Sequence, residues 1–444
     1  MRAQSQHFAP NLSLEGGVRR STGVRAASIP PSLKLIILLI FIPEELSFYI
    51  GDFRLSPIRL FLFLLTPVLL VHFSQLLASK ERRLVFSDVL IILAGIWMII
   101  APAVVVDLGY ALNHAAPVAV DFCGSYFATR VLLSGRGQAS NFVNLLCHII
   151  AIVALSGALD ALTATPFIHD FLRGLTGYVK PYSIEYRMGI FRSMGPIDHP
   201  ILFGTVCAFG LLLAVTSPIR AKALTISACG LGVLLSLSSA PIQAAVLGLG
   251  LIAFDRIFAR YPSRWSFLIG VVALGIGSIY AYTNSPMGFV FDHLMFDSSS
   301  GWVRVYQWSL AGSFIQNSPW VGIAFQWTEM VMNMPDRWYF SASVDSYWLN
   351  LALIYGIPGV ILVGLSIIGV AYYPVSGRDV TLTVSESKLA TTLGIIISLI
   401  VFLGFTVDFW GICWMFVPLL VGVRAHLAEL GSKRLTDQRP SRNR

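Results

Sequence analysis

The sequence predicts an all-α fold, a polytopic integral membrane protein with about twelve transmembrane helices. Of its 444 residues, 56% are hydrophobic and only 12% are charged, whereas ordinary soluble domains carry roughly 25% charged residues. Apolar runs that could cross a bilayer recur along nearly the whole chain. A soluble globular enzyme is therefore excluded. We predict one membrane domain over residues 33–424, between polar cytoplasmic tails at 1–32, expected to be disordered, and 425–444.

The candidate membrane helices are runs of mostly apolar residues separated by polar or charged segments. Pro43, Glu44 and Glu45 interrupt the first run, so whether it is a full crossing stays open. The candidates are Leu35 to Ile50, Leu60 to Leu77, Val89 to Val106, Ala111 to Leu133, Phe142 to Leu159, Ile201 to Val215, Ala223 to Leu237, Ile242 to Phe254, Trp265 to Tyr282, Tyr347 to Tyr373, Leu389 to Val407 and Phe409 to Val423.

The distribution of basic residues predicts the orientation. Basic residues resist translocation and accumulate on cytoplasmic loops. If the N-terminus is inside, few of the 31 Lys and Arg residues fall outside, namely Arg54, Arg59, Arg173, Lys180, Arg187, Arg192, Arg304 and Arg337. Both tails are then cytoplasmic, and two long segments, 161–200 and 283–344, face outward. The second is a large outer loop.

Several functions find no support in the sequence. The formal net charge of +8 is what cytoplasmic loops of a membrane protein produce, so nucleic acid is not needed as a partner. The five cysteines are scattered without a C-x-x-C pair, and no metal-ligand spacing or nucleotide-binding loop is present. We therefore expect no metal and no cofactor.

The first outward segment ends in the stretch 191–200, which contains Arg192, Asp198 and His199 and leads directly into an apolar run. An Arg beside a helix start favours phosphate, because free N–H groups and a planar bidentate cation converge there. The alternative is an Arg that caps its own turn. His199 is a candidate proton carrier, with a structural hydrogen-bond partner as its alternative.

The second outward segment predicts an amphipathic interfacial helix around residues 302–311, with Asn317 to Pro319 ending it and Gly322 in a turn. Arg304 projects from this helix, either as an anion-binding group or to reach lipid head groups. Asp345 is predicted at the N-cap of the tenth run. Two further acidic residues, Asp121 and Asp408, lie in or near the membrane and are functional candidates without an assigned role.

Three local patterns, taken with the topology, resemble the O-antigen ligase and polymerase superfamily of bacterial surface-polysaccharide assembly. They are Arg192-x-x-Gly195 with 198–200 and Gly204, Arg304-x-x-x-Trp308 with Pro319-x-x-Gly322, and Asp345-Ser-Tyr347 with Gly356. The motifs span roughly 188–365. Their order along the chain and their predicted position on one side of the membrane carry the resemblance.

The resemblance implies a glycosyltransferase of the C type in the bacterial inner membrane. Its donor would be an undecaprenyl-diphosphate-linked oligosaccharide on the periplasmic face. The functionally important arginines of the family would fall on Arg192 and Arg304, which would bind the diphosphate. From the residues themselves we add Asp345, as base or orienting group for the acceptor hydroxyl, and His199 as the catalytic candidates. A chain-length regulator protein and membrane lipids are the other expected partners.

Two departures from the family pattern bear on the kind of reaction. Ligase-type members commonly have a His where this chain has Asp345, and many members have Ser-Arg-Gly where this chain has 238–240, Ser-Ser-Ala. The first favours an exopolysaccharide-type polymerase over a ligase to a lipid or protein acceptor. The second removes an expected basic residue. A secondary transporter or lipid-linked sugar flippase is the alternative from a different functional class.

The orientation is tested by cysteine labelling in intact cells. A membrane-impermeant thiol reagent should modify a cysteine at position 330 in the second outward segment, because that segment is expected outside. A cysteine at position 260, among inner basic residues, should react only after permeabilisation. Labelling of position 330 from the cytoplasmic side alone would contradict the orientation.

Overall fold

The computed structural model describes residues 28–50, 53–79, 82–135, 137–178, 185–283, 298–327, 330, 344–372 and 382–432. In these ranges the protein is largely helical, and eight helices are long and apolar enough to cross a membrane. They are α2 (Pro57–Ala78), α3 (Phe86–Val105), α6 (Gln138–Thr163), α10 (Ser239–Ile257), α11 (Arg264–Tyr282), α15 (Tyr347–Ala371), α16 (Val384–Leu403) and α17 (Ile412–Ser432). The chain is therefore a multi-pass membrane protein.

Three further apolar runs also form helices, although they are shorter. A short turn of helix, α4 (Leu108–Tyr110), and a π-helical turn, η2 (Ala111–Ala115), lead into α5 (Ala116–Leu132). The sixth and seventh runs form α8 (Pro200–Thr216) and α9 (Lys222–Leu235).

The first apolar run is not one continuous helix. It forms α1 (Pro31–Leu39), then a 3-10 turn, η1 (Glu44–Leu46), because Pro43 cannot continue the backbone hydrogen bonds of a helix. The run nevertheless extends along α6. The carbonyl of Ser28 accepts from Gln138 at the start of α6, and Glu45 bonds to His169 just beyond its end.

Short strands and non-spanning helices complete the fold, so the all-α prediction omitted two small hairpins. These are β1 (Phe48–Ile50) with β2 (Phe53–Leu55), and β3 (Tyr186–Arg187) with β4 (Ile190–Phe191). The two segments predicted to face outward contain α7 (Phe167–Thr176), α13 (Ser298–Asn317) and η3 (Ala324–Gln326). The helix predicted around 302–311 is longer, since α13 begins at Ser298, and it ends at Asn317, inside the stretch 317–319 predicted to stop it.

The predicted tail boundaries are partly outside the described residues. Residues 1–27 and 433–444 are not described, and α1 already begins at Pro31. At the other end α17 continues to Ser432, well beyond the predicted end of the last apolar run at Val423. The helix continues because its last turns pack inside the protein, and Glu429 is buried there.

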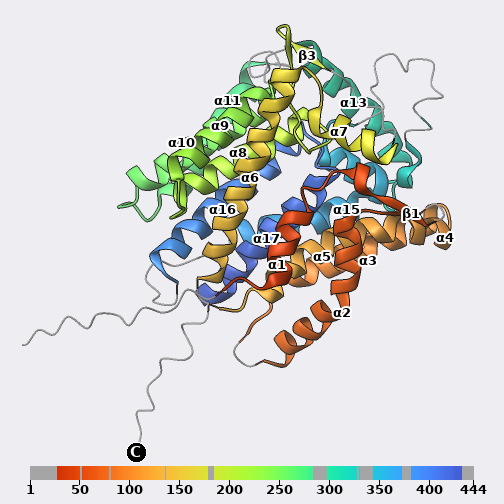
Figure 1. Ribbon diagram of the computed structural model, residues 1–444, viewed down its shortest axis with the longest axis horizontal. Coiled ribbons are helices and arrows are strands. Elements are labelled where there is room, and N and C mark those ends of the chain that lie inside the picture. The colour runs from red at the N-terminus through yellow and green to blue at the C-terminus, as the bar shows by residue number, and fades with distance from the viewer. Residues whose placement is uncertain are drawn as a thin grey trace, which may run out of the picture.

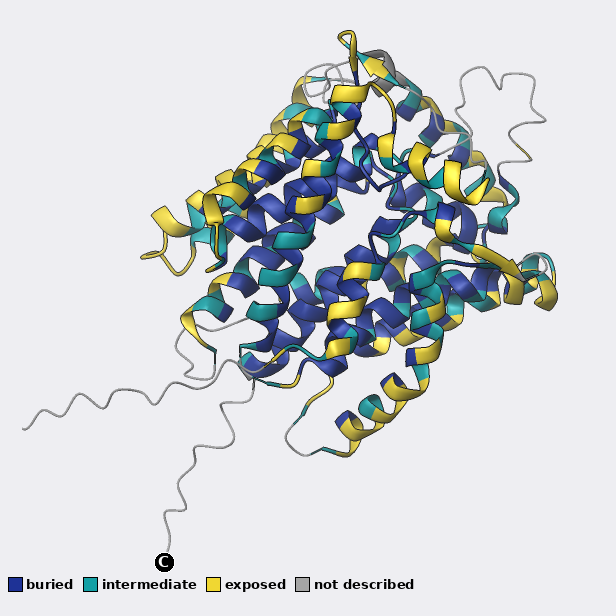
Figure 2. Ribbon diagram, in the orientation of Figure 1, coloured by how far each residue is buried: buried dark blue, intermediate teal, exposed yellow. Residues whose placement is uncertain are grey.

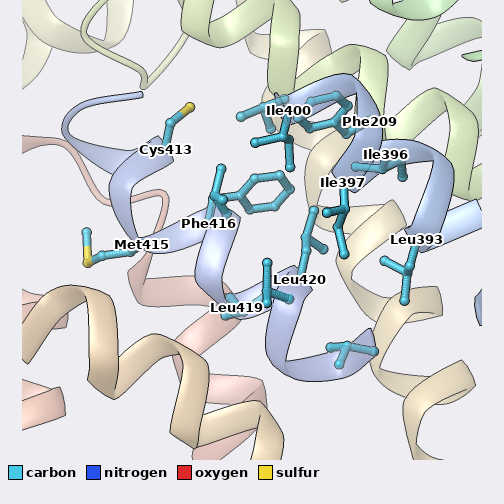
Figure 3. Close-up of a cluster of buried hydrophobic side chains, with 14 of the residues drawn as sticks. Phe209, Leu393, Ile396, Ile397, Ile400, Cys413, Met415, Phe416, Leu419 and Leu420 are labelled. Carbon is cyan, nitrogen blue, oxygen red and sulfur yellow. The ribbon is translucent and has the colours of Figure 1, made fainter. Parts of the chain in front are cut away.

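The helices form two packed groups joined by α16 (Figure 1). In one group α5 packs on α17 and α2, and α3 packs on α15. In the other, α8 contacts α6, α9 and α10. Figure 2 shows that buried residues fill the centre, while α11 and the C-terminal end of α2 are largely exposed at the edges. Figure 3 shows the junction, where Phe209 of α8 meets Ile396, Ile400 and Phe416 of α16 and α17. Exposed apolar helices at the edge are what lipid contact requires.

A buried ionic network joins α3, α5 and α17. The guanidinium of Arg130, which is fully buried, donates to Asp88 at 2.8 and 2.9 Å and to Glu429. Tyr126 donates to the same Asp88 carboxylate, and Arg82 donates to Glu429 at 3.1 Å. Because every charge has an opposite partner and hydrogen bonds, the network is tolerated at depth, and removing one member would leave a buried charge unpaired.

Two glycines hold the break in α15 against the loop that follows α13. Gly356 has φ +70° inside the helix, and Gly322 has φ +70° in the loop. The Ile357 N–H donates to the carbonyl of Pro319 (2.8 Å), and the Ile323 N–H donates to that of Leu353 (2.7 Å). The break therefore does not leave these backbone groups unpaired, and two of the three sequence patterns meet here.

Substitution of Gly356 by Ala tests this contact. An added Cβ would lie 2.3 Å from the carbonyl oxygen of Trp320, at a positive φ that an L-residue rarely adopts. We expect a loss of roughly 2 kcal/mol or more in stability, measured as a lower thermal unfolding temperature in detergent. The control is Gly364→Ala in the same helix, where the new Cβ makes an ordinary contact at 3.6 Å. Equal unfolding temperatures for the two variants would contradict the argument.

Candidate functional site

The β3–β4 hairpin and the loop after it form the frame of the candidate site. Met188 and Gly189 join the strands with φ of +54° and +75°, the left-handed pair of a type I′ turn. The carboxylate of Asp160 at the end of α6 accepts from the N–H groups of Met194 (2.9 Å) and Gly195 (2.7 Å), and from that of Phe167 (3.0 Å). Asp160 is fully buried, so it fixes the loop that carries Arg192.

Arg192 directs its guanidinium into the turn between α9 and α10. Its Nε donates to the carbonyl of Ser236 (3.3 Å) and its Nη2 to the hydroxyl of Ser238. Its Nη1 forms an ion pair with Glu185, which precedes the hairpin. The side chain is only 6% exposed. The guanidinium is thus bound on several sides by residues outside its own turn, so the alternative that Arg192 only caps this turn does not describe its contacts.

Arg304 reaches the same region from α13. Its Nη2 lies 3.9 Å from the carboxylate of Asp345, and its side chain is 10% exposed, whereas that of Asp345 is 38% exposed. Gln307, one turn further along α13, accepts from the Asp345 N–H at 3.1 Å. The predicted interfacial helix therefore presents Arg304 to a carboxylate of the protein.

The predicted N-cap of α15 is one residue off. Ser346 is the N-cap, and its hydroxyl accepts from the N–H of Leu349. Asp345 precedes it, and its backbone N–H is held by Gln307 instead. The physical reason is that this contact with α13 fixes Asp345 outside the helix. Helix capping therefore does not account for the carboxylate of Asp345.

His199 joins the cluster from the start of α8. Its Nδ1 accepts from the Ile201 N–H (3.2 Å), which makes it the N-cap and assigns the proton of a neutral ring to Nε2. Nε2 lies 3.9 Å from Glu185. The structural role foreseen as the alternative is thus present, and this tautomer favours His199 as a hydrogen-bond donor.

Two members of the site were not singled out from the sequence. Glu185 pairs with Arg192, and Arg187 of β3 donates to the carbonyl of Leu237 (2.9 Å) in the α9–α10 turn. The sequence pointed to Arg187 only through its place among the few basic residues expected outside. Nothing in the sequence pointed to Glu185, because its pairing with Arg192 depends on the hairpin fold.

The electrostatics of the site are dominated by burial. Burial lowers the pKa of Arg192 and of Arg304, and the positive charge of Arg187 lowers the pKa of both further, while Glu185 and Asp345 respectively act in the opposite direction. Burial also lowers the pKa of His199, with Arg192 adding to the effect and Glu185 and Asp345 opposing it. The arginines stay charged at neutral pH and the imidazole is neutral. Arg187 therefore lies within electrostatic range of both Arg192 and Arg304.

A cavity of about 310 Å³ lies beside this cluster. The two acidic residues without an assigned role are in its wall. Asp121 forms an ion pair with Arg59 of α2, and Asp408 accepts from Asn350 of α15 (2.8 Å). Trp410, also in the wall, packs edge-on against His199 with ring centroids 6.2 Å apart. The sequence indicated Asp121 and Asp408 as functional candidates, but it did not predict that they line the same cavity.

No protein-family profile matches the sequence, and no curated protein matches it. Among the described residues there is also no group of three or more His, Cys, Asp or Glu residues that could hold a metal ion.

Asp408 predicts a pH dependence of stability. Burial raises its pKa to about 7, with Asp345 adding to the rise and Asn350 opposing it. Since the unfolded value is about 3.9, the folded state binds this proton more tightly, and its contribution to stability is lost as the pH rises from about 4 through 7. Asp408→Asn should remove that loss, which is at most about 4 kcal/mol in the free energy of unfolding. The variant should therefore have a higher unfolding temperature than wild type at pH 8.

The matched control for this measurement is Asp255→Asn, which alters a partly exposed ion pair with Arg264. Thermal unfolding of both variants and wild type at pH 5 and pH 8 makes the comparison. A wild-type protein that is more stable at pH 8 than the Asp408→Asn variant would contradict the assignment.

Proposed function

We propose that this protein is a metal-independent membrane glycosyltransferase of the bacterial inner membrane. It takes an oligosaccharide from undecaprenyl diphosphate on the periplasmic face and joins it to a second carrier-linked unit, as in exopolysaccharide or O-antigen polymerisation. One observation carries the proposal. Arg192 and Arg304, which are far apart in the sequence, lie in one cluster with Asp345.

The charge of the cluster supports an anionic ligand. Three guanidinium groups, those of Arg187, Arg192 and Arg304, gather here around the carboxylates of Glu185 and Asp345. Buried cations are costly unless anions neutralise them. A diphosphate supplies that charge, and guanidinium groups bind phosphate in a bidentate geometry.

The chemistry follows from where charge develops. When the bond between sugar and diphosphate breaks, the leaving diphosphate gains negative charge, which the fixed arginines stabilise. The acceptor hydroxyl must lose a proton to a base. Asp345 can take this role, because its carboxylate is 38% exposed and lies beside Arg304. His199 carries its proton on Nε2, 3.9 Å from Glu185, and would donate a hydrogen bond from there to the bound ligand.

The third arginine bears on the departure in the 238–240 turn. The family pattern expects a basic residue there, and this chain has Ser238. Arg187 brings a guanidinium to the same turn from the hairpin, bonded to Leu237, and Ser238 accepts from Arg192. A basic group beside this turn is therefore retained from another segment.

The topology completes the proposal. We propose about twelve crossings, with both tails cytoplasmic and segments 161–200 and 283–344 periplasmic. The first run would cross as a broken segment, and α8 and α9 would cross as short helices, which is compatible with shielding by protein. The buried network of Arg130 would lie toward the cytoplasm, nine residues or about 13 Å along α5 from Asp121.

A ligase acting on a lipid or protein acceptor is the related alternative. A transporter or flippase is a second candidate from another class, and one observation favours it. Both the first run and α15 are broken, and both line the same cavity, as broken helices do in transporters. The two classes differ in product, because a polymerase lengthens the glycan and a transporter moves it unchanged.

Lysine substitution tests diphosphate binding at Arg192 and Arg304. A lysine keeps the charge but cannot reproduce bidentate contacts, so we expect polymer yield to fall tenfold or more at unchanged protein amount. Arg264→Lys, at a partly exposed ion pair with Asp255, is the matched control and should have normal yield. Full polymer yield from both site variants would refute the assignment.

Substitution of Asp345 tests the base. Ser346 provides the helix cap, so Asp345→Asn leaves α15 intact but removes the proton acceptor. We expect the Asn variant to insert normally and to make no long polymer, as seen on a gel at matched expression. Asp345→His retains a proton acceptor, and partial activity there would support proton transfer. Long chains of normal amount from the Asn variant would remove Asp345 from the mechanism.

A further inference from the structure

We call Arg187, Arg192 and Arg304, with Glu185 and Asp345, the arginine cluster. The cavity beside it has different chemistry. Its wall comes from distant parts of the chain, namely the broken first run, β2, α2, α5, η3, α15, the turn between α16 and α17, and the start of α17. Its volume of about 310 Å³ is within the range of small-molecule sites. Arg192, Arg304 and Asp345 do not line it, so we treat it as a chamber distinct from the cluster to which the diphosphate is assigned.

The charges in the wall are nearly balanced. Arg54 pairs with Glu44 and Arg59 pairs with Asp121, so these four residues contribute no net charge. Asp408 adds a carboxyl group. The chamber has no excess of positive charge to attract a phosphate or another anion.

Aromatic faces and polar groups are combined in this wall. Trp410, Trp414 and Tyr347 line the chamber, together with the carboxyl of Asp408 and the amide of Asn350. Aromatic rings offer flat apolar faces, and carboxyl and amide groups bond hydroxyls. A sugar ring presents both an apolar face and hydroxyl groups, so this combination fits a saccharide.

One polar group of the chamber is unsatisfied by the protein. The hydroxyl of Tyr355, on α15 just before the break at Gly356, is buried and has no hydrogen-bond partner among the described residues. Buried polar groups are rarely left in this state. A hydroxyl of a bound molecule would satisfy it.

The chamber adjoins the arginine cluster. The ring of Trp410 packs against His199, whose neighbours are Glu185 and Arg192. On the other side, Asp408 lies within electrostatic range of Asp345. A saccharide in the chamber would thus lie next to the place where the donor bond is proposed to break.

We propose that this chamber binds an uncharged saccharide, the sugar end of the acceptor glycan, through Asp408, Asn350, Tyr355 and the face of Trp410. The acceptor role rests on the proposed function. Binding of the saccharide itself does not, because it requires neither carrier lipid nor turnover. The near balance of charge selects neutral sugars over uronic acids.

Saturation-transfer-difference NMR on the full-length protein in nanodiscs tests binding directly. The probes are oligosaccharides released by mild acid from the surface polysaccharide of the producing cells, with a set of neutral hexoses, N-acetylhexosamines and hexuronic acids. We expect saturation transfer to at least one neutral saccharide and none to the hexuronic acids. Absence of transfer to every neutral probe, or equal transfer to the hexuronic acids, overturns the proposal.

Tyr355→Phe is the sharpest variant, because it removes only the unsatisfied hydroxyl and should not unfold the protein. We expect saccharide affinity to fall about fivefold, the equivalent of one hydrogen bond. Tyr280→Phe on α11, where the side chain is exposed, is the matched control and should bind normally. Unchanged affinity in both Tyr355→Phe and Asp408→Asn overturns the assignment of the chamber.

The arginine variants separate this proposal from the function. If Arg192→Lys binds saccharide normally and loses polymer, both stand. If it binds saccharide normally and makes normal polymer, the diphosphate assignment fails and the saccharide site stands. If wild type binds no neutral saccharide while the lysine variants lose polymer, the saccharide site fails alone.

Discussion

A single buried carboxylate, that of Asp160, holds the loop on which the candidate site depends. It accepts three backbone N–H groups, two of them from the loop between the β3–β4 hairpin and α8. This loop contains Gly195 at φ +56° and has no regular secondary structure. A loop without its own backbone ladder needs such partners when it is buried. Arg192 and His199 are on this loop, so their positions follow from that of Asp160.

The second constraint is the cost of burying arginines. Arg192 and Arg304 are each held by one carboxylate and by fixed neighbours, and neither guanidinium has moved to the surface. Arg130, in contrast, is surrounded by Asp88 and Glu429 in a closed network. The Arg130 network pairs two arginines, Arg82 and Arg130, with the two carboxylates of Asp88 and Glu429. Arg304, in contrast, lies 3.9 Å from a carboxylate, that of Asp345, which is 38% exposed.

Sequence alone predicted the helical plan well, because long apolar runs leave few alternatives to a helix in a membrane. Eleven of the twelve predicted runs coincide with helices, and α13 ends within the stretch 317–319 that the sequence predicted as its stop. For the first run, the sequence showed an interruption at Pro43 but did not decide whether the run crosses the membrane in full. The β3–β4 hairpin was missed, since two-residue strands have no detectable periodicity.

The site was predictable in part for a related reason. The residue type of each arginine and its place near a helix end were visible, and the structure brings Arg192, Arg304, Asp345 and His199 into one neighbourhood. The N-cap was assigned to Asp345 instead of Ser346, because both residue types cap helices and only the contact with Gln307 decides. Glu185 and Asp160 depend wholly on tertiary contacts.

The central claim is that the arginine cluster binds a lipid diphosphate. The most direct measurement is a cryo-electron microscopy structure of the protein in nanodiscs prepared with undecaprenyl diphosphate. The account predicts phosphate density within hydrogen-bond distance of the guanidinium groups of both Arg192 and Arg304. The account would be contradicted by diphosphate density elsewhere in the protein. In that case Arg192 would bond only to Glu185, Ser236 and Ser238, and Arg304 would face only Asp345.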